Sequence, residues 1–287
     1  MKIVVASGKG GVGKSMVASS LSVLFAKEYR IVACDCDVDA PNLGLWLGVT
    51  EYDERKKVTT SEKAFIKSQE NAKKCGLDPE ICRFGAISIE DGQYRIDSML
   101  CEGCGLCAFL CPTGIEMRFV ENGEIRIKKN TKYGFPLIDA QLGPGETGSG
   151  KLVEELKKEL KRFEYDIVIL DSAAGTGCPV ISSVRGSDFA LIVTEPTPAG
   201  ISDMKNMLKV IEHFKIPFAV VINKYDLNEK LTEWIEENIG NVVGKIRYDK
   251  DVIKAIVNLT PVVAFKSDGA SKDITEMFER LRETLHL

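Results

Sequence analysis

The sequence lacks three features that would place it in common classes of protein. It contains no run of about 18 uncharged apolar residues, the length that a membrane-spanning helix needs. No charged leader with a long apolar run precedes the strand-like KIVVAS after Met1, so we expect a cytoplasmic protein. An excess of basic residues is also missing, because the net charge is -4. We therefore expect neither a membrane span nor nucleic acid as a binding partner.

Cysteine, by contrast, is abundant. The chain has nine cysteines, and six of them lie between Cys75 and Cys111. A reducing cytosol disfavours a framework of structural disulfides, so this density predicts metal or redox chemistry.

Short β-branched apolar runs alternate with segments of helical spacing along most of the chain. The runs that predict strands are 2–7, 30–37, 166–172, 189–196, 218–223 and 261–265. The segments that predict helices are 15–27, 151–163, 201–214 and 272–285. This alternation predicts an α/β fold with a doubly wound, mostly parallel sheet.

The alternation fails between about Thr50 and Lys132, where the chain is charged, then cysteine-rich, then hairpin-like at 90–96 and 121–127. A separate inserted domain explains this better than one long loop. We expect a nucleotide-binding domain formed by residues 1–55 and 130–287. The insert then spans 56–129 as a small α+β domain.

SGKGGVGKS, Ser7 to Ser15, fits the phosphate-binding pattern G-x4-G-K-[ST] and lies between a predicted strand and a predicted helix. The glycines let backbone amides approach the phosphates, Lys14 reaches the outer phosphate oxygens, and Ser15 can ligate Mg²⁺. The cofactors expected are ATP or ADP with Mg²⁺. The residues expected to contact the nucleotide here are Gly8, Lys9, Gly10, Gly11, Val12, Gly13, Lys14, Ser15 and Met16.

KGGVGKS with its first lysine, Lys9, resembles the deviant Walker A motif of the ParA, MinD and nitrogenase iron protein class of P-loop ATPases. In that class the first lysine reaches the nucleotide of a facing subunit. The resemblance therefore implies a dimer across the nucleotide, either a homodimer or a heterodimer with a paralogue.

Two further segments resemble the switches of the same class. DCDVDAPN, 35–42, is similar to the first switch, in which Asp37 orients the attacking water or holds the Mg²⁺ shell. DSAAGTGCP, 171–179, is similar to the second, with Asp171 in a Walker B role. With Lys9 and Lys14, these aspartates are the predicted catalytic residues. Asp39 is either part of the first switch or a turn cap.

VVINKYD, 220–226, ends a predicted strand with Asn223, where the class holds adenine by an asparagine. The same letters fit N-K-x-D, the guanine-reading signature of GTPases, so GTP stays as the alternative to ATP. The chain departs from the class at Arg247, where relatives commonly have proline.

CEGCGLCAFLCP, 101–112, spaces its cysteines as C-x2-C-x2-C-x3-C followed by proline. This is the bacterial ferredoxin run for a 4Fe-4S cluster, in which the fourth cysteine usually serves a different cluster. A zinc knuckle is the alternative, since tetrahedral thiolate sites also suit zinc.

A decayed repeat of this run precedes it. When Cys111 is aligned with Cys82, Cys104 falls on Cys75, whereas the first and third cysteines of the run fall on Ala72 and Asp78. If the fourth cysteines are exchanged between the halves, one complete ligand set results. The set consists of Cys82, Cys101, Cys104 and Cys107.

The opposite set contains Cys75, Asp78 and Cys111 but no fourth ligand, because alanine cannot bind metal. Three outcomes stay open there: free thiols, a three-iron cluster that uses Asp78, or a Cys75–Cys111 disulfide as in single-cluster ferredoxins that this pattern resembles. Cys178 lies where the nitrogenase iron protein has a cluster-ligating cysteine. A buried small hydrophobic residue is the favoured interpretation of Cys178, and an interface thiol is the alternative.

The combination of motifs resembles MinD-superfamily ATPases with an inserted ferredoxin domain. It implies an ATPase whose nucleotide state controls electron transfer to a redox partner. The alternatives are a carrier or scaffold that passes an iron-sulfur cluster to an acceptor protein, and a positioning ATPase like MinD or ParA. The carboxy-terminal helix argues against the last, because its apolar side at Ile274, Phe278 and Leu281 is expected to pack on the sheet.

Overall fold

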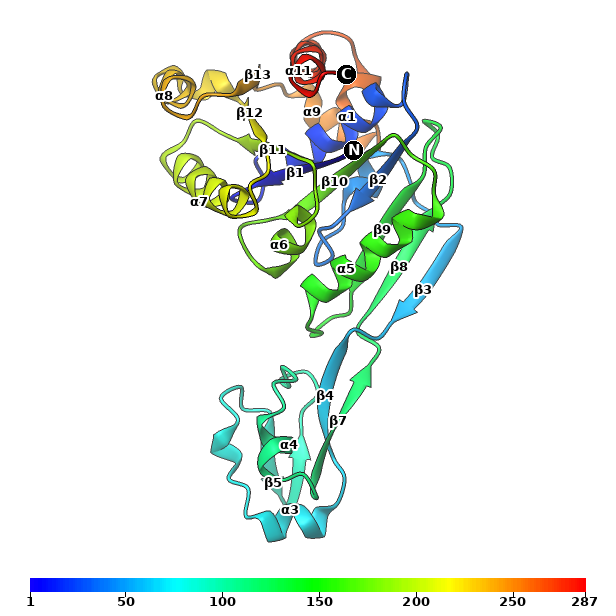
Figure 1. The fold of residues 1–287 in the computed structure, drawn as a ribbon, viewed down its shortest axis with the longest axis vertical. Helices are drawn as coiled ribbons and strands as arrows, with labels where there is room; N and C mark the ends of the chain where they lie inside the picture. The colour runs from blue at the N-terminus through cyan, green and yellow to red at the C-terminus, as the bar shows by residue number, and fades with distance from the viewer.

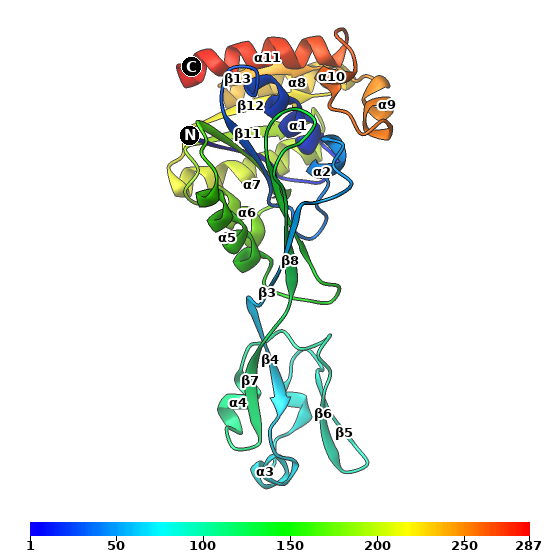
Figure 2. The same cartoon turned by 90° about the vertical axis from the view of Figure 1, so that its right-hand side faces the viewer.

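The computed structural model describes residues 1–287 and places two bodies of unequal size at opposite ends of an elongated molecule (Figures 1 and 2). The larger body holds a nine-stranded sheet with helices on both faces. The smaller body, which we call the cysteine module, comprises residues 59–122 between two strands of that sheet. None of the helices in either body has the length and apolar character needed to cross a bilayer.

The large sheet has the order β13-β12-β11-β1-β10-β2-β9-β8-β3. The strands from β13 to β9 are mutually parallel, whereas β8 and β3 are antiparallel to their neighbours. The bounds are β1 Lys2–Ser7, β2 Ile31–Asp35, β3 Glu54–Val58, β8 Gly123–Lys128, β9 Leu137–Leu142, β10 Ile167–Ala174, β11 Phe189–Thr194, β12 Phe218–Asn223 and β13 Val242–Ile246. This confirms the predicted doubly wound, mostly parallel α/β fold.

Both faces of the sheet are buried because successive side chains of a strand point to opposite faces. In β1, Ile3 and Val5 join one core of 34 buried residues, whereas Val4 and Ala6 join another of 28. Strands covered on both faces need continuous apolar runs, and this is why the central strands could be recognised in the sequence.

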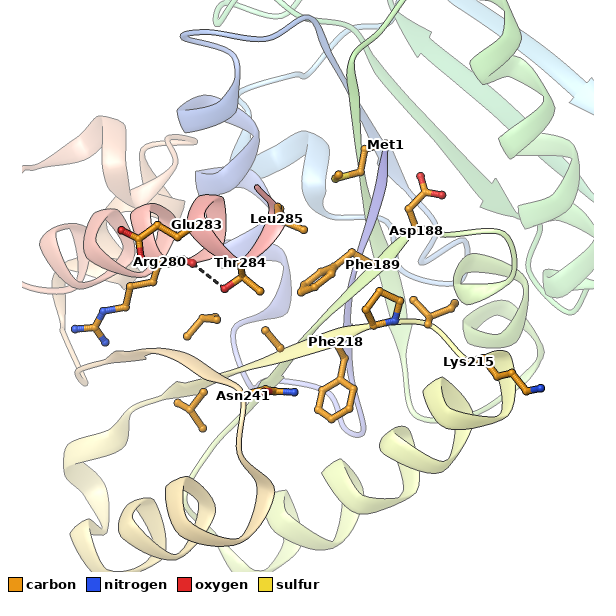
Figure 3. A pocket seen from close by; sticks show the side chains of 15 residues that line it. Met1, Asp188, Phe189, Lys215, Phe218, Asn241, Arg280, Glu283, Thr284 and Leu285 are labelled. Atoms are coloured by element: carbon orange, nitrogen blue, oxygen red, sulfur yellow. Dashed lines mark hydrogen bonds between the residues drawn. The ribbon is translucent and has the colours of Figure 1, made fainter. Parts of the chain in front are cut away.

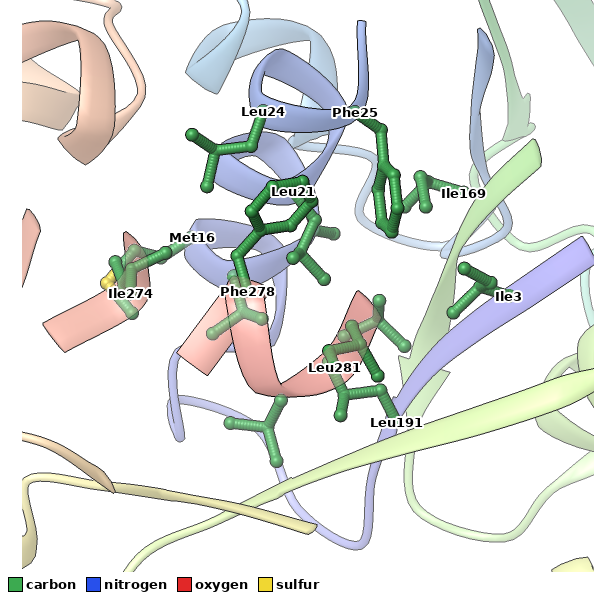
Figure 4. Packing of buried hydrophobic residues seen from close by; sticks show 14 of the residues in the cluster. Ile3, Met16, Leu21, Leu24, Phe25, Ile169, Leu191, Ile274, Phe278 and Leu281 are labelled. Carbon is green, nitrogen blue, oxygen red and sulfur yellow. The ribbon is translucent and has the colours of Figure 1, made fainter. Parts of the chain in front are cut away.

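Helices of opposite ends of the chain cover one face of the sheet together. There, α1 (Lys14–Phe25) packs against α11 (Ala270–Leu285), and the rings of Phe25 and Phe278 meet edge to face with centroids 4.8 Å apart (Figure 4). The predicted packing of the carboxy-terminal helix on the sheet is confirmed. The other helices of the larger body are α2 Leu43–Trp46, α5 Ser149–Glu159, α6 Cys178–Val184, α7 Pro198–Phe214, α8 Glu229–Ile239, α9 Asp251–Val257 and α10 Val262–Phe265.

One predicted strand is wrong. Residues 261–265 form the short helix α10, which begins after Pro261 and packs against α1. Pro261 and Val262 are buried, whereas Phe265 is 36% exposed, so one turn of helix buries its apolar side where a central strand would need both sides buried. The edge strand is instead β13, which the sequence analysis did not identify.

The neck between the bodies consists of two strand pairs placed end to end. β3 and β8 pair within the large sheet, and β4 (Ser61–Ile66) pairs with β7 (Ile115–Val120) in the module (Figure 2). The domain limits expected at residues 56 and 129 thus fall in β3 and just after β8. Residues 121–127 are not a hairpin, because β7 and β8, which flank Glu121 and Asn122, do not pair with each other and belong to different sheets.

The cysteine module has a small core. A cluster of eight buried residues lies among the β4-β7 pair, α3 (Gln69–Cys75), α4 (Leu106–Leu110) and the hairpin of β5 (Ile87–Glu90) with β6 (Gln93–Ile96). The hairpin confirms the turn expected at 90–96. The ferredoxin-like nature of the module stays a prediction.

Candidate functional site

A cavity of about 450 Å³ lies at the carboxyl ends of β1 and β12. Most of the residues that the motifs single out line this cavity, although the phosphate loop and Asn223 are more than 200 positions apart in the chain. The predicted residues in its lining are Lys9, Gly10, Gly11, Gly13, Lys14, Ser15, Met16, Asp37 and Asn223. Gly8 and Val12 belong to the same loop but do not line the cavity.

The loop between β1 and α1 has the shape that a phosphate needs. Gly13 precedes α1 with φ 95°, in the left-handed region, and no side chain caps the helix. The first amides of α1 therefore point into the loop without a partner from a cap, and such amides favour an anion. A Cβ atom at Gly8 would collide with the backbone carbonyl of Asp203, so the loop also needs a glycine there.

Lys14 forms a buried ion pair with Asp171, with Nζ and Oδ1 2.6 Å apart. Burial by itself would lower the pKa of Lys14, but Asp171, Asp35 and Asp37 outweigh it and raise the pKa. The ammonium is therefore charged throughout the physiological range. It stands where a negatively charged phosphate can replace the carboxylate as its partner.

The second oxygen of Asp171, Oδ2, is buried and has no hydrogen-bond partner. Ser15 Oγ is close by, 3.4 Å from Lys14 Nζ. A hydroxyl beside an unpartnered carboxylate oxygen is a donor set that suits hydrated Mg²⁺, which prefers oxygen ligands and keeps several waters. The residues therefore fit the predicted magnesium site.

Asp35 organises the first switch, a role that the sequence analysis missed. Its fully buried carboxylate accepts hydrogen bonds from the backbone amides of Asp37, Asn42 and Leu43 at 2.8–3.0 Å. Burial, reinforced by nearby Asp171, raises the pKa of Asp35 well above its ordinary value. Position alone, at the end of a strand, could have signalled this residue.

Asp37 projects into the cavity, and burial raises its pKa as well. A carboxylate with a raised pKa is a better proton acceptor than an ordinary one. Asp39 is exposed and does not line this cavity.

Lys9 lies against its own chain. Its Nζ is 2.5 Å from Glu195 Oε1, and Lys224 reaches the other oxygen of Glu195 at 3.3 Å. Although burial would raise it, the two lysines lower the pKa of Glu195. Asn223 is also engaged, since its Nδ2 donates to the carbonyl of Val12 at 2.8 Å. Glu195, which directly follows β11, is a second residue that the motifs did not identify.

Cys101 is buried in the core of the cysteine module, Cys82 and Cys107 pack against that core and are partly buried, and Cys104 is exposed. Backbone amides donate to two of the sulfurs: Ala64 N–H to Cys101 Sγ at 3.4 Å and Ala86 N–H to Cys82 Sγ at 3.3 Å. Hydrogen bonds to sulfur are among the contacts that set the properties of thiolate-bound clusters.

Cys107 lies close enough to Cys101 and Cys104 for their charges to affect it. Burial raises its pKa, and Cys101 and Cys104 contribute in the same direction as like charges. No three His, Cys, Asp or Glu side chains in the structure are arranged to hold a metal ion. The set of four thiols and two amides nevertheless has the chemistry that an iron-sulfur cluster requires.

Cys75 and Cys111 form a disulfide, with Cα atoms 5.8 Å apart. Of the three outcomes left open for this half of the repeat, the structure thus has the disulfide. The carboxylate of Asp78 accepts the backbone N–H of Glu80 and caps a short turn, η1 (Pro79–Ile81).

Cys178 is exposed, so its interpretation as a buried hydrophobic residue is wrong. It is the first residue of α6, whose buried residues are Val180, Ser183 and Val184. Cys34 is buried in the core.

A larger cavity, of about 980 Å³, lies at the amino-terminal ends of β11 and β12, beside the end of α11 (Figure 3). Phe189, Phe218 and Leu285 contribute to its apolar lining, and none of the predicted site residues takes part. It is therefore separate from the nucleotide site.

Comparisons with known proteins agree with this geometry. The sequence profile of the CobQ/CobB/MinD/ParA nucleotide binding domain matches residues 3–262. The uncharacterized protein MJ0578 of Methanocaldococcus jannaschii is 35% identical over 292 residues, which cover 99% of this chain and 97% of that protein. An iron-sulfur cluster carrier protein of Pyrococcus horikoshii is 26% identical, over 98% of this chain and 85% of its own.

Among solved structures, the cell division ATPase MinD of Pyrococcus furiosus superimposes with a TM-score of 0.64 at 19% identity. The match covers 99% of this chain and 98% of that one. At this identity the likeness concerns the fold alone.

Proposed function

Because the chain belongs to the CobQ/CobB/MinD/ParA nucleotide-binding domain family, we propose that it hydrolyses ATP and couples its nucleotide state to electron transfer through a 4Fe-4S cluster in the cysteine module. The observation that carries the first half is the cavity around Lys14, with its uncapped helix end and unpartnered Asp171 oxygen. The second half rests on the cysteine spacing and on the amides aimed at two of the sulfurs.

In the proposed hydrolysis, Lys14 exchanges Asp171 for the outer phosphates of ATP. Ser15 and, through water, Asp37 or Asp171 would hold Mg²⁺, which neutralises charge on the phosphates. Asp37 orients a water molecule for attack on the γ-phosphorus, so that the bond to the β-phosphate oxygen breaks and ADP and phosphate leave. Asn223 and the loop after β12 lie nearest to the base, with ATP preferred and GTP as the alternative.

Lys9 has a second role in this proposal. It leaves Glu195 and reaches the nucleotide of a facing subunit, which requires a homodimer or a heterodimer with a paralogue. A triphosphate carries more negative charge than the single carboxylate of Glu195, so it can compete for Lys9. The protein acts in the cytoplasm under this proposal.

Cys82, Cys101, Cys104 and Cys107 would hold the cluster, which supplies one-electron transfer when bound. The residues of the module position the sulfurs, and the Ala64 and Ala86 amides stabilise negative charge on them. One electron arrives from a reduced donor protein and leaves to an oxidised acceptor protein.

The acceptor is proposed to contact the module around Cys104. Between Ser98 and Ile115 the only charged residue is Glu102, and several large apolar side chains are exposed there. They are Met99, Leu100, Leu106, Phe109 and Leu110. Five such side chains offer less than the roughly 800 Å² per partner of a stable interface, so a transient redox protein fits better than a permanent subunit.

A cluster carrier is the second candidate, because carrier proteins are among the relatives at 26% identity. A carrier delivers its cluster to an apoprotein, whereas an electron-transfer protein retains it over many redox cycles. Incubating the loaded protein with an apo-ferredoxin and a chelator distinguishes them. Retention of the cluster throughout excludes the carrier role, and delivery excludes the electron-transfer role.

The ATPase half is tested by Asp37→Asn, with Asp39→Asn as the matched control on the exposed side of the same switch. We expect a fall in kcat of about 100-fold or more for the first, because a positioned base contributes that much, with nucleotide binding retained. The control keeps wild-type turnover. Equal turnover in both variants would contradict the role of Asp37.

The cluster half is tested by counting iron and acid-labile sulfide after anaerobic purification. Wild type and the control Cys178→Ala should hold four irons for each chain, as the proposed stoichiometry requires. Cys82→Ala should lose the intact cluster. A stable protein with zinc in place of iron, or four irons in Cys82→Ala, would overturn the assignment.

A further inference from the structure

Lys63 is a buried charge beside the cysteine site. It lies in β4, its side chain is 2% exposed, and its Nζ is 2.5 Å from the carbonyl oxygen of Ser98, three positions before Cys101. Burying a lysine ammonium is costly unless it is paired. Even a paired buried charge loses solvation energy, so its presence here needs an explanation, and no motif in the sequence supplies one.

The segment around Lys63 is packed directly on the cysteine run. The next residue, Ala64, donates its amide hydrogen to Cys101 Sγ at 3.4 Å. On the other side, a Cβ at Gly103 would collide with the carbonyl of Glu62, so only a glycine permits this approach. Lys63 thus belongs to the strand that supports Cys101.

The partner of Lys63 comes from the other body. Glu146 Oε2 lies 3.0 Å from Lys63 Nζ, with its side chain 22% exposed. This oxygen is buried and makes no hydrogen bond, so the ion pair is its main interaction. Glu146 stands in the loop 143–148 between β9 and α5, outside the module.

The same loop is attached to the first switch. Leu142, the last residue of β9 before the loop, donates its amide hydrogen to the carbonyl of Val38 at 2.8 Å. Val38 directly follows Asp37 in the chain. Gly143 then donates to the carbonyl of Asn122 at the neck, at 3.0 Å. Asn122 in turn binds the carbonyl of Thr147 through its side chain at 2.8 Å. A short chain of contacts therefore runs from the switch to Glu146.

We propose that Lys63 tunes the redox potential of the cysteine site by its charge, and that Glu146 sets how much of this charge the site experiences according to the state of the first switch. This rests on the proposed function, since it concerns the cluster held by Cys101. Lys63 is a positioning and tuning residue here and does not ligate metal. The nucleotide changes the redox potential through Glu146.

The sign follows from electrostatics. An added electron makes the cluster more negative, so a nearby positive charge favours the reduced form and raises the potential. When Glu146 is paired with Lys63, most of that effect is cancelled. When the switch withdraws Glu146, the potential rises.

The test is a redox titration of the cluster by electron paramagnetic resonance, without nucleotide, with Mg-ADP, and with a non-hydrolysable Mg-ATP analogue. In nucleotide-free E146Q, we expect the ratio of reduced to oxidised cluster at a fixed potential to rise about tenfold, or about 59 mV for one electron. The difference between the two nucleotides, present in wild type, should vanish in E146Q. K63M should lower the potential and also abolish the nucleotide effect.

The matched control is Glu121→Gln, which removes an exposed ion pair with Lys57 at the same neck. It should titrate like wild type. If E146Q matches wild type in potential and nucleotide response while the cluster is intact, this inference fails and the proposed function stands. If wild type holds no iron, or its potential ignores nucleotide, the proposed function itself fails. Because Gln is isosteric with Glu at a partly exposed position, E146Q remains informative even if K63M does not fold.

Discussion

The two bodies of the molecule are stabilised in different ways. The larger body has cores of 34 and 28 buried residues on the two faces of its sheet, whereas the module has one of eight. A core of eight residues is below what usually maintains a fold, and small domains add disulfides or metal. The module has a disulfide and a run of thiols, so cysteines contribute both to its folding and to its proposed chemistry.

The exposed fraction of phenylalanine side chains also differs between the two bodies. Phe109 in the module is 81% exposed, whereas the phenylalanine at the heart of the larger body, Phe278, is 5% exposed. The module thus leaves part of its apolar surface uncovered. The larger body exposes apolar side chains too, such as Ile253 and Val257, but they are few beside its two cores.

The largest expected effect is that of iron removal. Removing the iron anaerobically with a chelator should unfold the module, because the bound cluster is expected to supply stability that the small core does not. Amide hydrogen exchange should then become fast over 59–122 and stay slow in the large sheet, with nucleotide binding unchanged. Protection of the module that survives iron loss would contradict this view.

The paired substitutions Phe278→Ala and Phe109→Ala measure the contrast in packing. We expect the first to lower the free energy of unfolding by about 3–5 kcal/mol, as for large core deletions. The second should change it by less than about 0.5 kcal/mol but slow reduction of the acceptor. Urea denaturation and donor-to-acceptor kinetics provide the two readouts. Similar stability losses would erase the distinction between the bodies.

Cys75→Ser removes the disulfide from the module. The bond closes a separation of 36 residues, and disulfides of this kind contribute about 2–4 kcal/mol. Because Cys75 is exposed, serine fits there without a packing penalty, and only the module should become less stable. Proteolysis of native protein should shift to sites in 59–122, while Cys178→Ser leaves the pattern unchanged.

The smallest effect concerns a surface pair of the larger body. Hydrogen bonds from Arg30 lower the pKa of Asp166 to about 2. The folded pKa lies below the ordinary value, so the stability it contributes is present above about pH 4 and is lost as the pH falls through 2. In Arg30→Gln, NMR titration should find the Asp166 pKa raised toward its ordinary value, because the side-chain hydrogen bonds are lost while the backbone amide of residue 30 still donates, and the acid limb of stability should flatten. An unchanged pKa would refute the pairing.

Sequence reasoning succeeded where one local rule decides the structure. The central strands are apolar throughout because both faces are covered, and the phosphate loop is specified by a few adjacent residues. It failed at the edges, where 261–265 and β13 have similar composition and only the packing against α1 separates helix from strand. Asp35 and Glu195 were missed because their partners are backbone amides and lysines brought together by the fold.

The cysteine site shows the same limit. The spacing of the run and its half-repeat singled out the ligand candidates, whereas the exposure of Cys178 depends on how α6 begins. The Lys63–Glu146 ion pair joins the two bodies, and no sequence pattern in either segment predicts it. Long-range polar pairs of this kind require the fold.

The register of the neck has one more consequence. Val58 and Gly123 are directly paired at the end of the β3-β8 ribbon, so the large sheet is already closed there without the module. Topologically, the whole of 59–122 occupies the place of a hairpin turn. A chain in which a two-residue type I′ turn joins these positions would keep every strand of the nucleotide-binding body. The module therefore stands where a hairpin loop would stand, a kind of position that tolerates inserted domains.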